Sequence, residues 1–150
     1  MASKAQFRVL VVDEGAVLAS MARWILARPD LDLVGTARNA AEALDAVERL
    51  RPDLVILEAV LHGMDGFRLA RAIKSREEAP LVVLVTFHAS AAARDEARAA
   101  GADGFLAKYD FTDGFAALLE EWRSDQAGRP GQIKTPVIPD RPGSRTVPDP

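Results

Sequence analysis

Five apolar runs are spaced along the chain, and each is short enough to form a single strand. Three of them, at 7–12, 54–57 and 81–85, are continuous and rich in valine and leucine, a pattern typical of strands buried on both faces of a parallel sheet, and the other two are shorter candidates. The five runs occupy positions 7–12, 31–36, 54–57, 81–85 and 104–107.

Between these runs, apolar residues recur every three or four positions, as they do along one face of a helix. The helical segments cover positions 17–26, 43–50, 67–73, 91–100 and 111–122. The fourth is followed by Gly101, a residue type that favours the end of a helix. Strands that alternate with helices predict right-handed βαβ units. We therefore expect an α/β fold with a doubly wound, five-stranded parallel sheet and helices on both faces.

The pattern ends near residue 124, and the rest of the chain has a different composition. The segment from Gly128 onward holds six of the nine prolines and shows no periodic apolar stripe. We therefore divide the chain into an extension (1–6), one domain (7–124) and a proline-rich tail (125–150) that we expect to be extended or disordered. The PVIP sequence at 136–139 suits docking into a partner's groove, and a solvated extension or linker is the simpler alternative.

Composition narrows the classes of protein to which the chain can belong. Its 150 residues have the length of one domain, and a formal charge of −3 with a pI near 5.4 gives no reason to expect binding to nucleic acid or to an anionic membrane. The absence of cysteine excludes disulfides and thiolate metal sites. No apolar run approaches the roughly 18 residues that span a bilayer, and the N-terminus lacks the features of a signal peptide, so we expect a cytoplasmic protein.

Polar, charged and aromatic residues follow the apolar runs, at the carboxyl ends of the expected strands. In open α/β sheets, this edge binds ligands. The residues there are Asp13, Glu14, Glu58, Thr86, Phe87, His88 and Lys108. Clustered carboxylates repel each other and favour a cation, for which Mg²⁺ with its oxygen ligands is the natural choice. A phosphoryl group would complete the site, with the hydroxyl of Thr86 and the ammonium of Lys108 as its donors.

Four segments at these positions resemble one family. VLVVDE, PDLVILEAVLHGMDG, LVVLVTFH and AGADGFLAK occur in this order. Together they make residues 7–124 similar to the receiver domain of response regulators in two-component systems, of the single-domain chemotaxis type. The resemblance implies a flavodoxin-like sheet with strand order 2-1-3-4-5. It also implies a Mg²⁺ site made by Asp13, Glu14, Glu58 and Val60.

The resemblance assigns a role to each of the remaining site residues. Glu58 stands at the phosphoacceptor position, Thr86 is the switch hydroxyl, and Lys108 contacts the phosphoryl group. Phe105 stands at the aromatic switch position, where the side chain turns inward or outward with the state of the site. If the site is inert, Phe105 is only a semi-buried aromatic residue.

The chain departs from the family at the acceptor and beside it. Glu58 replaces the usual aspartate, Phe87 replaces a small residue, and His62 and Tyr109 stand where proline is common. Glutamate places its carboxylate about 1 Å farther from the strand, and a displacement of this size costs roughly 10²-fold in a reaction that depends on positioning. We therefore expect impaired or absent phosphorylation.

Glu58 and Phe87 each have two interpretations. The longer arm of Glu58 moves negative charge toward Lys108 and Thr86 and partly imitates a phosphorylated site, with one charge instead of nearly two. Alternatively, Glu58 only keeps an acid near the metal. Phe87 either blocks the pocket against a phosphodonor or turns into the core.

The same edge offers ligands for a different metal. His62 and His88, together with Asp13 and Glu58, have the atom types that bind a transition ion such as Zn²⁺. Neither histidine shows the spacing of a helical ligand pair, so two solvated loop histidines are the simpler interpretation.

The function we expect is that of an atypical stand-alone receiver in phosphorelay signal transduction, which is not an enzyme and acts through protein contact. Its partner would be a histidine kinase or a downstream signalling protein, bound by the surface of segments 91–100, 104–107 and 111–122. A homodimer is compatible with the same surface. The alternative is a functional phosphoacceptor that takes phosphate from a histidine kinase with Mg²⁺.

Overall fold

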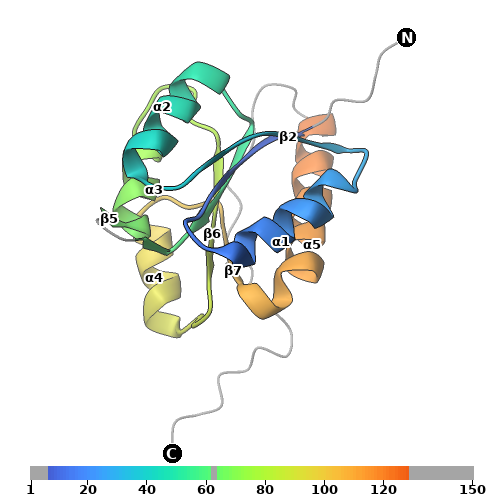
Figure 1. The fold of residues 1–150 in the computed structure, drawn as a ribbon. Coiled ribbons are helices and arrows are strands. Elements are labelled where there is room, and N and C mark those ends of the chain that lie inside the picture. Colours follow the sequence, from blue (N-terminus) through green and yellow to red (C-terminus); the bar gives the residue numbers. More distant parts are fainter. Residues whose placement is uncertain (1–6, 62–63, 129–150) are drawn as a thin grey trace, which may run out of the picture.

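The computed structural model describes residues 7–61 and 64–128, which form a three-layer α/β fold (Figure 1). A five-stranded sheet lies in the middle in the order β2-β1-β3-β6-β7, and each neighbouring pair is parallel. The strands are β1 (Phe7–Val12), β2 (Leu31–Ala37), β3 (Leu54–Glu58), β6 (Leu81–Thr86) and β7 (Gly104–Ala107). Counted within this sheet alone, the order is the predicted 2-1-3-4-5, so the expected fold class is confirmed.

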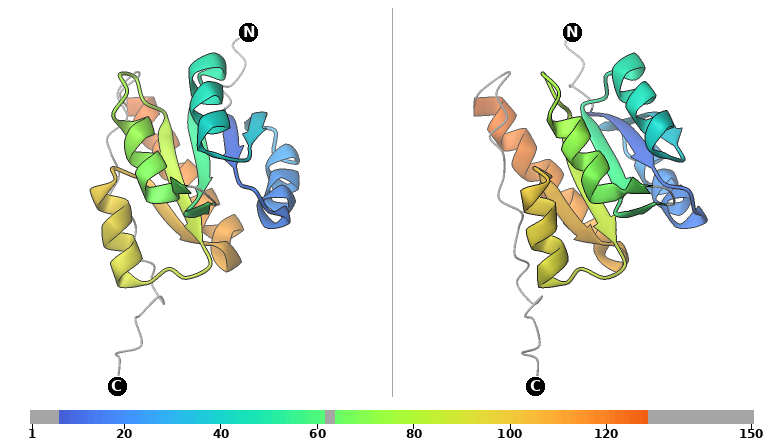
Figure 2. Two further views of the ribbon diagram at one scale, coloured as in Figure 1. Left: turned by 60° about the vertical axis from the view of Figure 1, so that its left-hand side comes forward. Right: turned by 90° about the vertical axis from the view of Figure 1, so that its left-hand side faces the viewer.

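Helices cover both faces of the sheet, α1 and α5 on one and α2, α3 and α4 on the other (Figures 1 and 2). The helical elements are α1 (Ala16–Leu26), α2 (Ala40–Leu50), α3 (Gly66–Lys74), α4 (Ala91–Ala99), the 3₁₀ turn η1 (Lys108–Asp110) and α5 (Phe111–Gly128). Helix α5 thus continues past residue 124, and the expected boundaries of domain and tail stay predictions. None of the helices within residues 7–61 and 64–128 combines the length and the apolar character needed to cross a membrane.

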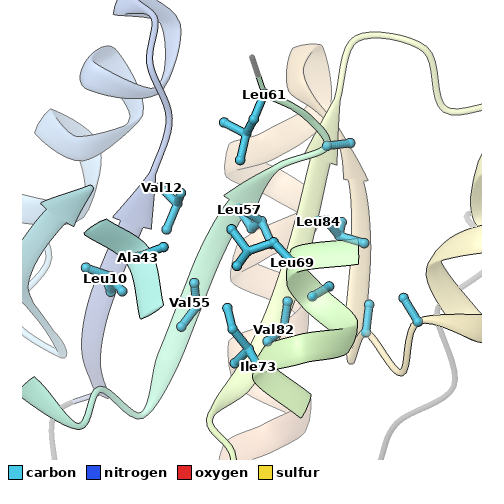
Figure 3. Packing of buried hydrophobic residues seen from close by; sticks show 14 of the residues in the cluster. Leu10, Val12, Ala43, Val55, Leu57, Leu61, Leu69, Ile73, Val82 and Leu84 are labelled. Carbon is cyan, nitrogen blue, oxygen red and sulfur yellow. The ribbon is translucent and has the colours of Figure 1, made fainter. Parts of the chain in front are cut away.

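Successive residues of the inner strands point into two separate cores, which is why these strands are nearly continuous apolar runs in the sequence. In β1, Leu10 and Val12 belong to the core under α2, α3 and α4, whereas Val9 and Val11 belong to the core under α1 and α5. Figure 3 shows the first core, with Leu69 of α3 packed against the strand side chains. Burial of apolar surface stabilises such a sheet by about 25 cal/mol per Å².

The segment after β3 contains an element that the apolar pattern did not predict. Strands β4 (Val60–Leu61) and β5 (Met64–Asp65) pair in antiparallel fashion. The N–H of Gly66 bonds the carbonyl of Ala59 at 2.9 Å, and a side chain at this glycine would collide with the carbonyl oxygen of Glu58. Glycine is required for this close approach, which holds the segment against the end of β3.

Helix α4 ends at a glycine, as predicted. Gly101 has φ = 85°, a left-handed conformation that residues with a side chain rarely adopt. Its N–H bonds the carbonyl of Arg98 at 2.9 Å, and the N–H of Ala102 bonds the carbonyl of Ala97 at 3.0 Å. These two bonds form a Schellman motif, which ends the helix and directs the chain into β7.

A partly buried ion pair lies at the amino-terminal edge of the sheet. Asp103 is 2% exposed. Its carboxylate accepts hydrogen bonds from Nζ of Lys74 at 2.7 Å and from the N–H of Val82 at 2.9 Å. Nζ of Lys74 also donates to the carbonyl of Pro80 at 2.9 Å. Because both charges have further hydrogen-bond partners, their attraction offsets the cost of removing them from water. The Lys74–Asp103 pair therefore ties α3 to the start of β6 and β7.

A second charged cluster joins the turn between α1 and β2 to helix α5. The carboxylate of Asp30 accepts hydrogen bonds from two nitrogens of Arg28, at 3.0 and 2.8 Å. It also accepts one from Nη2 of Arg123. The hydrogen bonds from Arg28 hold the pKa of Asp30 well below its usual range, and the bond from Arg123 acts in the same direction. The folded state therefore favours the ionised carboxylate.

Candidate functional site

The predicted site residues lie at the carboxyl-terminal edge of the sheet, where β3, β6 and β7 end side by side (Figure 1). Glu58 is the last residue of β3 and pairs in register with Val85 of β6. Thr86 ends β6 opposite Ala107, and Lys108 follows β7 directly. Because neighbouring strands lie about 4.8 Å apart, side chains from these three strand ends reach one another.

Glu58 and Lys108 form a buried ion pair at this edge. Oε1 of Glu58 contacts Nζ of Lys108, and each side chain is only 7% exposed. Oε2 of Glu58 accepts the N–H of Val60 at 3.3 Å. Opposite charges attract more strongly where water is excluded, and removing one of them leaves the other buried without compensation. The carboxylate of Glu58 therefore takes the lysine contact that the resemblance assigns to a phosphoryl group.

Phe87 covers Lys108 from outside. Nζ of the lysine lies 4.1 Å from the centroid of the ring, a cation–π contact. The phenylalanine is 59% exposed, so its ring lies over the ion pair and outside the core. Of the two orientations considered for Phe87, the structure has the one that lies over the site. The ammonium group is thus enclosed between a carboxylate and an aromatic face.

The two switch positions are both buried. Thr86 is 6% exposed, and its hydroxyl accepts the backbone N–H of His88 in a long hydrogen bond of 3.4 Å. Phe105 is 4% exposed and packs into the core under α2, α3 and α4. The side chain of Phe105 therefore points inward, which is one of the two orientations that the resemblance assigns to it.

The acidic residues after β1 line a different part of the edge. Asp13 and Glu14 border a hollow of about 240 Å³ beside α1. Among residues 7–61 and 64–128, no three Asp, Glu or His side chains gather in a way that would hold a metal ion. The carboxylate of Glu58 faces Lys108 instead. As arranged, the predicted set of Asp13, Glu14, Glu58 and Val60 does not fit a Mg²⁺ ion, and the metal-binding role of these residues stays a prediction.

The alternative Zn²⁺ set depends on two loop histidines. His62 lies outside the described residues. His88 is exposed, and it is the backbone N–H of His88 that contacts Thr86. This set also stays a prediction.

Three large apolar side chains are exposed around the Glu58–Lys108 pair, a feature that the sequence did not predict. Val60, Phe87 and Tyr109 are 72, 59 and 82% exposed. Each follows one of the strand ends that form the site, and we call these three residues the apolar rim. The only signal in the sequence was the presence of bulky residues at two positions where the family usually has a small residue or proline. Exposed apolar residues that gather around one site are typical of a contact surface.

A protein family and several curated proteins are similar to this chain in sequence. Residues 9–118 match the family described as response regulator receiver domain. Protein-glutamate methylesterase/protein-glutamine glutaminase 2 of Koribacter versatilis is 38% identical over 104 residues, which are 67% of this chain and 28% of that protein. Protein-glutamate methylesterase/protein-glutamine glutaminase 3 of Myxococcus xanthus is 31% identical over 159 aligned positions, which cover 100% of this chain and 43% of that protein. The chain thus spans less than half the length of these relatives.

Solved structures share the fold. The signal receiver domain of the putative response regulator NarL from Mycobacterium tuberculosis has a TM-score of 0.72 at 28% identity, covering 79% of this chain and 96% of that one. The response regulator domain of Thermotoga maritima CheB has a TM-score of 0.68 at 27% identity, with coverages of 79% and 95%. Because the family match extends over most of the doubly wound domain, this chain belongs to the response regulator receiver domain family.

Proposed function

We propose that this chain is an atypical receiver in two-component signal transduction that acts by binding a protein partner and takes phosphate poorly or not at all. Family membership supports the signalling role in general. The observation that carries the specific part is the buried Glu58–Lys108 ion pair.

Phosphoryl transfer to Glu58 would require the pair to separate. The reaction needs an acceptor oxygen in line with the donor and a free cation to neutralise the transferred group. One carboxylate oxygen of Glu58 contacts Lys108, and the other accepts the N–H of Val60. The ring of Phe87 covers the same ammonium. A phosphodonor would therefore have to displace two contacts before the reaction begins.

The same contacts support one lasting conformation in place of a switch. Lys108 already has an anionic partner, and Phe105 is already buried. The imitation of a phosphorylated site is incomplete, because a carboxylate carries one charge and a phosphoryl group nearly two. We propose that the chain presents its partner surface without a phosphorylation signal.

The engaged carboxylate of Glu58 bears on the proposed cofactor, and the fold suggests the surface for the proposed partner. Receiver domains bind Mg²⁺ with the acids around the acceptor, and we propose weak or absent binding here because the Glu58 carboxylate is engaged elsewhere. The proposed partner is a histidine kinase or a downstream signalling protein, bound by α4, β7 and α5, and a homodimer would use the same surface. We propose a cytoplasmic location and no catalytic step for the described residues.

Acetyl phosphate with Mg²⁺, followed by intact-mass measurement, tests the proposal. We expect no acid-labile phosphoryl group on the unchanged chain, a partial gain in Glu58→Asp and a larger gain in Glu58→Asp combined with Phe87→Ala. The matched control is Glu48→Asp, because the side chain of Glu48 is 77% exposed and lies away from the site. Stoichiometric phosphorylation of the unchanged chain that is lost in Glu58→Gln would contradict the proposal and establish a functional phosphoacceptor.

A further inference from the structure

The apolar rim is exposed directly above a buried charge pair. The ring of Phe87 contacts Lys108, and the N–H of Val60 contacts Glu58, so two rim residues belong to the wall of the ion pair. Tyr109, the third, is 82% exposed. An occupant of this surface would remove three apolar side chains from water and exclude water from the ion pair beneath them.

We infer that the apolar rim binds the proline-rich tail of the same chain through the PVIP sequence at 136–139. Aromatic faces such as those of Phe87 and Tyr109 are the usual partners of polyproline segments, because the proline ring packs flat on them. A polyproline segment also loses little conformational freedom on binding, since it is extended beforehand. The inference concerns the surface alone and does not depend on whether Glu58 takes phosphate.

The length of the chain beyond α5 fits this assignment. Helix α5 begins next to the site edge and runs to the opposite end of the domain (Figure 1). Its 18 residues are about 27 Å long. The eight residues from 129 to 136 span about 25 Å as polyproline. A tail that turns back along α5 therefore brings the PVIP sequence to the level of the rim.

Charge favours the same contact. The tail from residue 129 onward carries four basic and two acidic residues, in a chain with a formal charge of −3. The remainder of the chain is therefore acidic, and Asp13 and Glu14 lie on the same edge of the sheet as the rim. Lys134 and Arg141 flank the PVIP sequence on either side. Opposite charges would steer the tail toward this edge and raise its local concentration there.

The composition of the chain allows a direct test on the 150-residue chain. Tyr109 is the sole tyrosine and there is no cysteine, so 3-fluorotyrosine gives one ¹⁹F resonance and a nitroxide label attaches at one introduced thiol. We would compare Thr135→Cys, beside the PVIP sequence, with Thr146→Cys, a matched control nearer the end of the tail. The label at position 135 is expected to broaden the Tyr109 resonance severalfold more than the label at 146.

Two further samples decide the origin of the broadening. Adding Pro136→Ala and Pro139→Ala to Thr135→Cys should abolish the excess broadening, with an unchanged amide spectrum for the domain as the control for folding. Equal broadening from both labels, or broadening that survives the proline changes, would overturn the inference. Broadening in a mixture where fluorine and label are on different molecules would also overturn it, because the occupant would then be the tail of a second copy.

Discussion

The two edges of the sheet each contain a pair of lysine and acid, partly buried at one edge and buried at the other, with different surroundings. At the amino-terminal edge, Lys74 and Asp103 have additional hydrogen bonds to the backbone of β6 and the residue before it. At the carboxyl-terminal edge, Lys108 and Glu58 have an aromatic ring and one long backbone bond. Backbone partners make the first pair a structural clamp. The second pair has one long backbone bond and lies beneath an exposed aromatic ring, which makes it the one within reach of a ligand or partner.

Removal of the clamp should have the largest effect on stability. Asp103→Ala leaves the ammonium of Lys74 and the N–H of Val82 without the carboxylate, and we expect a loss of about 4 kcal/mol in the free energy of unfolding. Urea denaturation measures this loss. The control is Asp45→Ala, which removes an exposed ion pair with Arg49 and should cost less than about 0.5 kcal/mol. A loss no larger than that of the control would show that the two edges do not differ as described.

The site pair should be the next most sensitive. Lys108→Met leaves the carboxylate of Glu58 buried without its cation, which should cost about 3 kcal/mol in the free energy of unfolding. The double variant Glu58→Gln with Lys108→Met removes both charges and should regain most of this loss. Urea denaturation of the single and double variants gives the coupling between the residues. If the double variant were as unstable as the sum of two single changes, the pair would not be coupled.

Sequence patterns predicted the strands that leave a long apolar run and missed those that are too short to show one. The runs at 7–12 and 104–107 coincide with β1 and β7, because burial on both faces leaves a continuous apolar run. The pairing of β4 with β5 was missed, because strands of two residues are too short to show a period. The approach of Glu58 to Lys108 was one of the two interpretations that the sequence allowed for this glutamate.

Two features of the site depend on side-chain orientations, which the spacing of residues in the sequence does not predict. The ring of Phe87 lies over Lys108, and the predicted alternatives were a blocked pocket or a ring in the core. The side chains of Val60 and Tyr109 point into solvent next to a buried ion pair, where an apolar residue is usually expected to be covered. The orientations of these three side chains could therefore not be predicted from their positions in the sequence.

The cation–π contact should contribute less than either ion pair. Phe87→Leu keeps an apolar side chain over the site but removes the aromatic face, and we expect a loss of about 0.5–1 kcal/mol in the free energy of unfolding. Tyr109→Leu is the matched control, since the cation–π contact with the lysine is made by Phe87, and this substitution should change the free energy of unfolding by about 0.3 kcal/mol. Equal effects of the two substitutions would show that the ring of Phe87 adds no specific contact to the pair.

The smallest expected difference is a change in the pH dependence of stability, and it concerns Asp30, whose pKa is lowered in the folded state by its bonds to Arg28 and Arg123. Above the ordinary carboxyl pKa of about 3.9, both folded and unfolded chains are ionised here and the stabilisation is complete. Below it, the unfolded chain binds a proton that the folded chain does not, so stability falls as the pH decreases toward the lowered pKa. Thermal unfolding of Asp30→Asn should therefore show a shallower decline below about pH 4 than the unchanged chain. If the stability of Asp30→Asn and that of the unchanged chain declined in parallel as the pH fell, the lowered pKa of Asp30 would be contradicted.

The most direct test of the closed site is an amide NMR titration with Mg²⁺ and then beryllofluoride, a phosphoryl analogue, on the unchanged chain and on Glu58→Asp. The ion pair predicts no response to beryllofluoride in the unchanged chain, because Lys108 already holds a carboxylate. In Glu58→Asp, whose shorter arm should release the lysine, shifts are expected at Thr86 and Lys108 that extend to Phe105. The same shifts in the unchanged chain would contradict the central claim, because they would show that the Glu58 pair opens to admit a phosphoryl group.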